Sequence, residues 1–166
     1  SHYGDEGEGA LWQATKFLGK KVNGVRLHRN LIIVQVYVPC PGEALYEHLK
    51  NLQGADPISA LIEQVANFMA KQVTAGTGVV LSGDFNADPS EAVVRTIKEE
   101  LASAYPDSTP FTTWKIRETG EQKSTLDYIF HSAGIQPSAT LDMPTEQQIG
   151  IDRLPSIAFP SDHLSM

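Results

Sequence analysis

The sequence predicts an α+β domain, in which the strands of a sheet are interleaved with helices. Three runs rich in apolar and β-branched residues, at 31–38, 79–81 and 126–130, are typical of buried strands. The segments 57–70 and 90–101 place apolar residues three and four positions apart, as helices with one buried face do. A chain of 166 residues is long enough for one domain that buries about 70% of its unfolded-chain surface.

The first part of the chain holds the expected early strands. Residues 1–9 space acidic residues with glycines and lack an apolar period, so we expect a lead-in without regular structure. Two short strands are expected at 10–17 and 20–27, on either side of Leu18-Gly19. The run 31–38 is almost continuously apolar and rich in β-branched residues, which favours a central position in the sheet.

Two helices are expected to cover this sheet. Asp56-Pro57 is a helix-start signal, because proline is tolerated in the first turn of a helix. The apolar face of the first helix consists of Ile58, Leu61, Ile62, Val65, Phe68 and Met69. Ser90 is the expected N-cap of the second helix, whose buried side consists of Val93, Val94 and Ile97.

The strand at 79–81 runs into the motif Ser82-Gly83-Asp84-Phe85-Asn86. Because side chains alternate along a strand, we expect Asp84 and Asn86 on one side and Phe85 in the core. Gly83 allows a close backbone approach, and Pro89 is expected to end the strand and open the next helix. The Asp84 carboxylate can orient or deprotonate a water, and the Asn86 amide can stabilise an oxyanion. The alternative is an ordinary turn at a strand end, where Asp and Asn are common.

The segment 112–114 is expected to be extended, followed by a hairpin turn at 118–121. Lys115 and Arg117 are candidate substrate-binding residues, because their charges suit a phosphate, although such side chains are more often simply solvated. Trp114 is a candidate platform for a base, but the high burial usual for tryptophan favours a place in the core.

The strand at 126–130 places Asp127 in an apolar setting, on the same side as Ile129. A carboxylate there is costly unless it is paired, so Asp127 requires a partner. The alternative is a surface acid on an edge strand. Near the end of the chain, Ser161-Asp162-His163 places a carboxylate and an imidazole side by side.

Three motifs, in this order, resemble the endonuclease/exonuclease/phosphatase family of metal-dependent phosphoesterases: 79–89, 124–130 and 160–166. Thr112-Thr113-Trp114-Lys115-Ile116-Arg117, and the segments 145–150 and 153–156, are similar to its nocturnin-like branch. The likeness is dense after Val79 and weaker before it. It implies a two-layer β-sandwich flanked by helices, of which residues 1–166 form a single incomplete domain, truncated on the N-terminal side.

The same resemblance implies catalytic roles. Asp127 is expected to pair with His163, which contacts the scissile phosphate, while Asp84 positions the attacking water and Asn86 meets the developing charge. Asp162 is expected near the metal, Mg²⁺ or Mn²⁺, and Mg²⁺ needs few carboxylates because it keeps several waters. The family carries a metal-ligating Glu and an Asn in its N-terminal portion, and no segment of this chain matches them. We therefore expect that the chain binds Mg²⁺ weakly and turns over slowly or not at all.

The segment after the strand 31–38 departs from the resemblance. In nocturnin-like proteins this strand runs directly into Thr-His-Leu-Lys, whose His and Lys face the substrate phosphate. Here residues 39–47 intervene before His48-Leu49-Lys50, and Leu52 stands where Arg is common. Either an insertion loops out and returns His48 and Lys50 to the site, or His48 lies at the start of a helix.

The implied activity is hydrolysis of a phosphoester in a nucleotide, with removal of the 2′-phosphate of NADP(H) expected from the nocturnin-like motifs. The first alternative is 3′-to-5′ degradation of poly(A) RNA, and the second is a non-catalytic interaction module. The net charge of −7 comes with scattered positive residues, of which only Lys20-Lys21, Arg26 and Arg29 lie near one another. This distribution favours a small nucleotide over a long phosphate backbone.

The sequence also bears on location and assembly. It holds no run of membrane-spanning length and no secretory signal pattern, so no membrane contact is expected. Its single cysteine, Cys40, excludes an internal disulfide and fits an intracellular, cytoplasmic protein. An uncovered face of a truncated sandwich would require either a partner or self-association to cover it.

Overall fold

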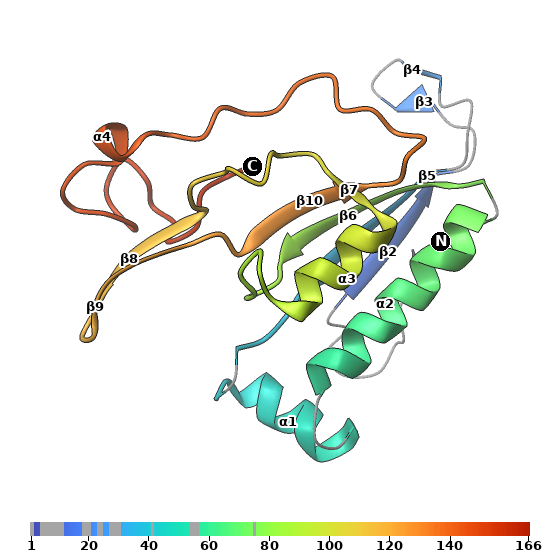
Figure 1. The fold of residues 1–166 in the computed structure, drawn as a ribbon, viewed down its shortest axis with the longest axis horizontal. Helices are drawn as coiled ribbons and strands as arrows, with labels where there is room; N and C mark the ends of the chain where they lie inside the picture. Colours follow the sequence, from blue (N-terminus) through green and yellow to red (C-terminus); the bar gives the residue numbers. More distant parts are fainter. Residues whose placement is uncertain are drawn as a thin grey trace.

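The structure, a computed structural model, describes the chain in eight segments: residues 2–3, 12–17, 21–22, 25–26, 31–40, 42–53, 57–74 and 76–166. Its main feature is a six-stranded sheet with the strand order β1-β2-β5-β6-β10-β7 (Figure 1). These strands are β1 (His2–Tyr3), β2 (Trp12–Phe17), β5 (Leu31–Tyr37), β6 (Gly78–Asp84), β7 (Ala102–Ser103) and β10 (Asp127–His131). The α+β class is confirmed.

The sheet is mixed. β5 and β6 are parallel, and the remaining neighbours pair antiparallel. β5 and β6 are also the third and fourth strands in the order, so the predicted central position of 31–38 is confirmed. Two hairpins lie outside this sheet: β3 (Lys21–Val22) with β4 (Val25–Arg26), and β8 (Thr113–Arg117) with β9 (Gly120–Ser124).

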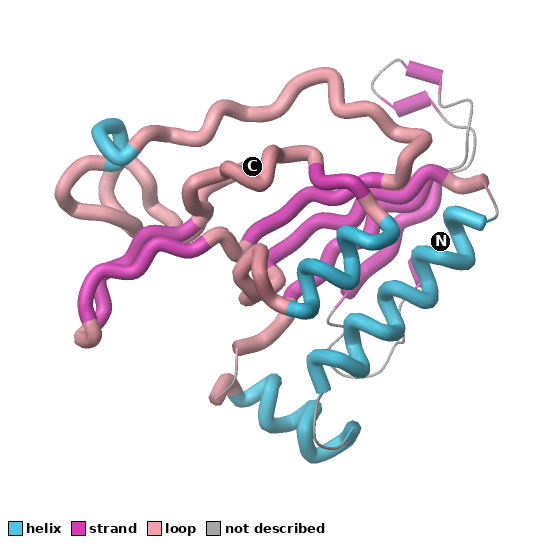
Figure 2. Tube along the Cα trace, in the orientation of Figure 1, coloured by secondary structure: helices cyan, strands magenta, loops and turns pink. Residues whose placement is uncertain are grey.

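Helices α2 (Pro57–Thr74) and α3 (Ala92–Glu100) lie across one face of the sheet, as Figure 2 shows in cyan. Alternate strand residues meet them there, and the resulting core includes Ile32, Val34, Val36, Val79, Leu81, Val65, Met69, Val94, Ile97 and Phe130. We call this the helix face. On the opposite face, Ile33 and Tyr37 remain exposed. α1 (Ala44–Gln53) precedes α2, and the short α4 (Glu146–Ile149) lies in the C-terminal segment.

The helix predictions hold with one correction. The helix expected at 57–70 is present and extends to Thr74. Ser90 is not the N-cap of α3: that residue is Glu91, and its side chain makes no capping hydrogen bond. Because a turn closes from Asp88 to Glu91, the Ser90 hydroxyl bonds to the Asp88 carboxylate instead, and the helix begins three residues after Pro89.

The early strands differ in detail from expectation. β2 lies within the predicted 10–17, but the expected strand at 20–27 is divided into β3 and β4. A short strand, β1, lies in the lead-in where no regular structure was expected. The rest of that lead-in, Leu18-Gly19 and residues 27–30 are outside the described residues. Within the described part of the chain, no helix combines the length and the apolar character needed to cross a bilayer.

Candidate active site

Three neighbouring strands bring their polar residues to one edge of the sheet. In the strand register, Tyr37 of β5 lies opposite Asp84 of β6, and Asp84 lies opposite Asp127 of β10. Paired residues on adjacent strands point to the same side, so all three side chains lie on the face away from the helices. Phe85 turns to the helix face, where it is fully buried in edge contacts with Tyr128 and Phe130, as predicted.

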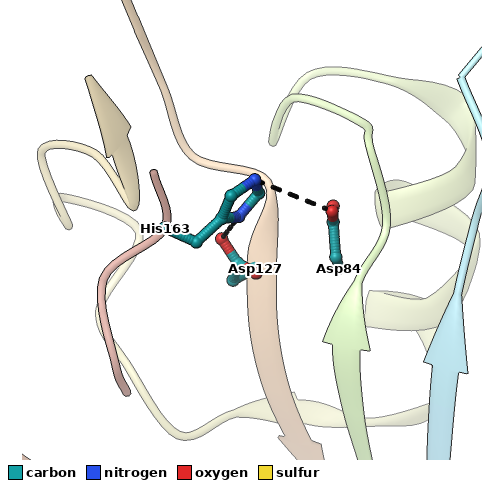
Figure 3. A group of neighbouring side chains, drawn as sticks. All are labelled: Asp84, Asp127 and His163. Atoms are coloured by element: carbon teal, nitrogen blue, oxygen red, sulfur yellow. Dashed lines mark hydrogen bonds and ion pairs between the residues drawn. The ribbon is translucent and has the colours of Figure 1, made fainter. Parts of the chain in front are cut away.

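His163 completes this group from the far end of the chain (Figure 3). Its Nδ1 lies 2.8 Å from Asp127 Oδ2, so the predicted pairing of these two residues is present. Because a carboxylate only accepts, Nδ1 carries the proton and Nε2 is directed toward Asp84, whose Oδ2 is 3.9 Å away. That separation is too long for a direct hydrogen bond, and a water or a substrate oxygen can bridge it.

The backbone around His163 fixes its position. Thr113 of β8 forms an isolated bridge with His163, and the Leu164 amide donates to the Thr112 carbonyl at 2.8 Å. The Thr112 hydroxyl in turn accepts from the backbone amides of Leu126 and Asp127. One buried threonine therefore joins the start of β10 to the segment that carries His163.

Asp84 is held in a partly desolvated position. Burial raises the pKa of its carboxyl group, and the charge of Asp127 adds to that shift. The Asn86 backbone N–H opposes the rise in pKa by donating to Asp84 Oδ1 at 2.8 Å. The charges of the nearby His163 and Lys115 also lower the pKa. A carboxylate with a raised pKa beside an imidazole is a reasonable general base.

Asn86 has a structural role beside its predicted catalytic one. Its backbone has a φ of +44°, a conformation that asparagine tolerates better than most residues. One amide hydrogen of Nδ2 is engaged, because this atom donates to the Val38 carbonyl at 2.6 Å. Asn86 therefore holds the chain that follows β5 against the site, while its contact with an oxyanion stays a prediction.

These residues border a cavity of about 330 Å³. Among the predicted site residues, its lining includes Asp84, Asn86, Lys115, Arg117, Asp162 and His163. Asp127 lies behind the His163 ring, to which it is bonded. The cavity is also lined by Tyr37, Cys40 and Glu43, which sequence reasoning missed as site residues. Their position in the sequence could have identified them, because Tyr37 ends a strand expected to be central and Cys40 and Glu43 come soon after it.

Lys115 and Asp162 form an ion pair within the cavity, with Nζ 2.7 Å from Oδ2. The Lys115 ammonium donates to the Asp162 carboxyl and holds its pKa below the usual range, so Asp162 is ionised at neutral pH. The ion pair places a cation and an anion beside His163. A metal ion bound by Asp162 would share this carboxylate with Lys115.

Trp114 lies in the core. Its side chain is 4% exposed, and it packs in a second apolar cluster with Phe111, Ile149, Leu154 and Leu164. The Lys123 ammonium and the Arg153 guanidinium lie 4.3 and 4.2 Å from its ring centroid. The ring is not among the residues that line the cavity, so the core alternative describes Trp114 better than the base-platform prediction does.

The structure also decides between the two alternatives for His48. His48 and Lys50 lie within α1, both are exposed, and neither lines the cavity. The residues that directly follow β5 beside the site are Val38, Pro39 and Cys40. The intervening segment 39–47 therefore leads into a helix that begins at Ala44, and it does not return His48 and Lys50 to the predicted site.

The donor atoms suit a hydrated divalent cation. Among the described residues, Asp84, Asp127 and His163 each offer an atom within 4.8 Å of the others. His163 and Asp127 are bonded to each other, so Asp84 and Asp162 are the predicted site carboxylates that line the cavity, and Asp162 is paired with Lys115. A few carboxylate oxygens completed by waters are the environment Mg²⁺ prefers, so these residues fit such an ion sparsely.

The fold and site define the class of protein. The family model described as the Endonuclease/Exonuclease/phosphatase family matches residues 9–163, and the chain belongs to that family. Within it, the chain is similar to nocturnins. It is 41% identical over 134 residues to Nocturnin of Xenopus laevis, which covers 73% of this chain and 32% of that protein. Against Nocturnin of Homo sapiens it is 39% identical over 134 residues, which covers 29% of that protein.

A solved structure agrees with this assignment. The human Nocturnin catalytic domain with bound sulfate anion is similar with a TM-score of 0.56 and 27% identity, covering 92% of this chain and 49% of that one. The likeness confirms the predicted sandwich-type fold with flanking helices, to which this chain contributes the sheet described above. The chain thus spans 32% of the length of the Xenopus relative and 49% of the human catalytic domain.

Proposed function

We propose that this chain belongs to a metal-dependent phosphoesterase that removes the 2′-phosphate of NADP(H). The observation that carries the proposal is that Asp127, His163 and Asp84 lie side by side where β6 ends and β10 begins. Asp84 and His163 share a cavity there with Lys115. The nocturnin-like motifs imply a nucleotide phosphoester as the substrate, and the 41% identity to Nocturnin of Xenopus laevis supports the likeness on which that implication rests. The sulfate bound to the human Nocturnin domain, an analogue of phosphate, supports an anion site in that protein.

The geometry suggests how these residues would divide the chemistry. Asp127 accepts the Nδ1 proton of His163 and so keeps Nε2 turned toward Asp84. A water lying between Nε2 and Asp84 can pass a proton to Asp84, and a His163 ring that carries a second proton, on Nε2, can donate to a phosphoryl oxygen. Lys115 and Arg117 would balance the phosphate charge. A divalent cation, when bound, would polarise the phosphoryl oxygen and stabilise the leaving alkoxide.

The charge distribution supports a small nucleotide over RNA. The net charge is −7. Of the described cationic side chains, Lys98, Lys115, Lys123 and Arg153 are each paired with an acid. A cavity of about 330 Å³ is near the lower end of the range for ligand pockets, which suits the phosphorylated end of a nucleotide.

The decisive experiment measures phosphate release from NADP(H) at millimolar Mg²⁺. We expect slow release by the wild type, and a loss of about 10²- to 10⁴-fold in Asp127→Asn, because the amide no longer fixes the His163 tautomer. Asp107→Asn is the matched control, since Asp107 pairs with Lys98 on the surface. Equal rates in Asp127→Asn and wild type would contradict the proposed roles.

One observation favours a second candidate, a non-catalytic interaction module. The cavity holds Tyr37 and Cys40 beside the end of β5, and the His and Lys that the family resemblance implies there lie exposed on α1. A Mg²⁺ titration followed by NMR at Asp84 and Asp162 separates the two candidates. Unchanged resonances at millimolar Mg²⁺, together with no phosphate release, would support the non-catalytic module.

A further inference from the structure

Tyr37 occupies an unusual position beside the proposed site. It is the last residue of β5, and the register places it directly next to Asp84 on the same face of the sheet. It lines the cavity, and 41% of its surface is exposed. Among the described residues that line the cavity, Tyr37 supplies the only phenol, phenyl or indole ring. An aromatic ring is thus presented to whatever the cavity binds.

The ring of Tyr37 is fixed at both ends. Its backbone belongs to a central strand, and its hydroxyl donates to Glu43 Oε2 at 2.7 Å. Glu43 is itself held by its backbone amide, which donates to the Cys40 carbonyl. The Glu43 hydrogen bond raises the pKa of Tyr37 to about 12. A ring that is immobilised before binding loses little entropy when a ligand stacks on it.

The charges around the cavity orient a nucleotide. Glu43 bonds to the Tyr37 hydroxyl and raises its pKa, so the negative charge of Glu43 makes this side of the cavity disfavour an anion. The positive side chains of the cavity, Lys115 and Arg117, come from the hairpin β8–β9. A phosphate would therefore lie toward the hairpin and His163, which leaves the uncharged part of the nucleotide toward Tyr37.

We propose that Tyr37 is the stacking surface for the base of the nucleotide, and so a residue that determines specificity for a base-bearing phosphoester over a base-free one. The inference rests on the proposed function, because it assumes that the cavity binds a nucleotide phosphate. Aromatic side chains stack on bases of any sequence, since every base has a π-face. Trp114 cannot take this role, because its ring is buried, contacts Lys123 and Arg153, and does not line the cavity.

The test compares two ligands that differ only in the base. AMP and ribose 5-phosphate are titrated into the full chain by calorimetry, with Mg²⁺ present. We expect the wild type to bind AMP about tenfold more tightly, and Tyr37→Leu to lose that advantage while binding ribose 5-phosphate unchanged. Tyr37→Phe keeps the ring and should retain most of the preference. The adenine protons should shift upfield by NMR in wild type and Tyr37→Phe, but not in Tyr37→Leu.

The control and the contrary outcomes are distinct. Tyr46→Leu on α1 removes a tyrosine that does not line the cavity and should leave both affinities unchanged. An equal loss for both ligands in Tyr37→Leu, or no loss for AMP, would overturn the stacking role. Equal wild-type affinities for AMP and ribose 5-phosphate would also overturn it and leave the proposed function standing. Binding of neither ligand by wild type would overturn the assumption that the cavity binds a nucleotide phosphate, on which the stacking role rests, while phosphate release from NADP(H) tests the proposed function separately.

Discussion

Asp84 occupies a position that suits its proposed role as a base but destabilises its charged form. The register of β5, β6 and β10 places its carboxylate beside that of Asp127, and burial removes part of its hydration. Both effects raise its pKa, so the folded chain binds the proton more readily than the unfolded chain does. The stability contribution of Asp84 is therefore fully present below its unfolded pKa and falls as pH rises through the folded pKa.

We predict that Asp84→Asn raises the melting temperature at pH 7. The amide cannot ionise, and its oxygen can still accept the Asn86 backbone N–H that Asp84 accepts now. The gain should shrink as pH falls toward about 4, close to the ordinary pKa of aspartate, because the raised pKa of Asp84 favours its protonated form there. Thermal unfolding at pH 4 and pH 7 measures both values.

Asp162→Asn serves as the opposite control. Lys115 lowers the pKa of Asp162, so this carboxylate stabilises the fold above its unfolded pKa and loses that effect as pH falls. Its replacement should lower the melting temperature at pH 7. A lower melting temperature for Asp84→Asn at pH 7 would show that the Asp84 charge is better compensated than its burial indicates.

At the scale of single elements, Gly83 determines how closely β6 approaches β5. Its φ is +151°, and a Cβ there would lie 1.8 Å from the Val36 carbonyl oxygen. We predict that Gly83→Ala destabilises the fold by about 3 kcal/mol, since overpacking a core commonly costs 1–3 kcal/mol and the nearest atom is backbone. Urea unfolding measures the loss.

Gly120 provides the matched control for this substitution. It also has a positive φ, +115°, but an added Cβ would meet nothing within 4 Å. Gly120→Ala should therefore cost only the backbone strain, about 1–2 kcal/mol. If both substitutions cost the same, the close approach between β5 and β6 would not be the reason for glycine at position 83.

The hairpin β8–β9 depends on the C-terminal segment. Arg153 stacks on Trp114, and its Nε donates to Glu121 of β9. The Leu154 amide donates to the Trp114 carbonyl at 3.0 Å. We predict that Arg153→Gln destabilises this junction, because a charge-assisted hydrogen bond and a cation–π contact are both lost.

Hydrogen exchange gives the local measurement for that prediction. The Leu154 amide should exchange faster in Arg153→Gln, because the contact between the two segments loosens. The control is Arg95→Gln, which changes an exposed residue of α3. Unchanged protection of Leu154 would mean that the apolar cluster around Trp114 holds the segment without Arg153.

At the scale of the whole molecule, charge sets the expected response to RNA. The net charge is −7, and much of the described positive charge is already paired with acids. We predict that oligo(A) binds with a dissociation constant weaker than the 10⁻⁴ to 10⁻⁶ M common for non-specific nucleic-acid binding, at about physiological salt. Fluorescence anisotropy at low and high salt measures it. Tight binding that weakens steeply with salt would instead support the poly(A) alternative.

Short stretches of sequence were sufficient to predict those features that depend only on residues close together in the chain. The alternation of a strand placed Phe85 in the core and Asp84 outside it, and the helical period placed α2 correctly. The cost of an unpaired carboxylate in an apolar strand required a partner for Asp127. The family motifs then indicated His163, which lies 2.8 Å away in the structure.

Tertiary structure decided which residues meet across the sheet. Tyr37 lies beside Asp84 only because β5 and β6 pair in parallel in one register, and a shift by one residue would turn the ring to the other face. The burial of Trp114 and the exposure of His48 likewise depend on packing between distant segments. The sequence by itself therefore determined the chemical groups and the sides of the strands on which they lie. The pairing of strands far apart in the chain decided which of those groups share a cavity, because strand register is fixed by contacts that no short stretch of sequence contains.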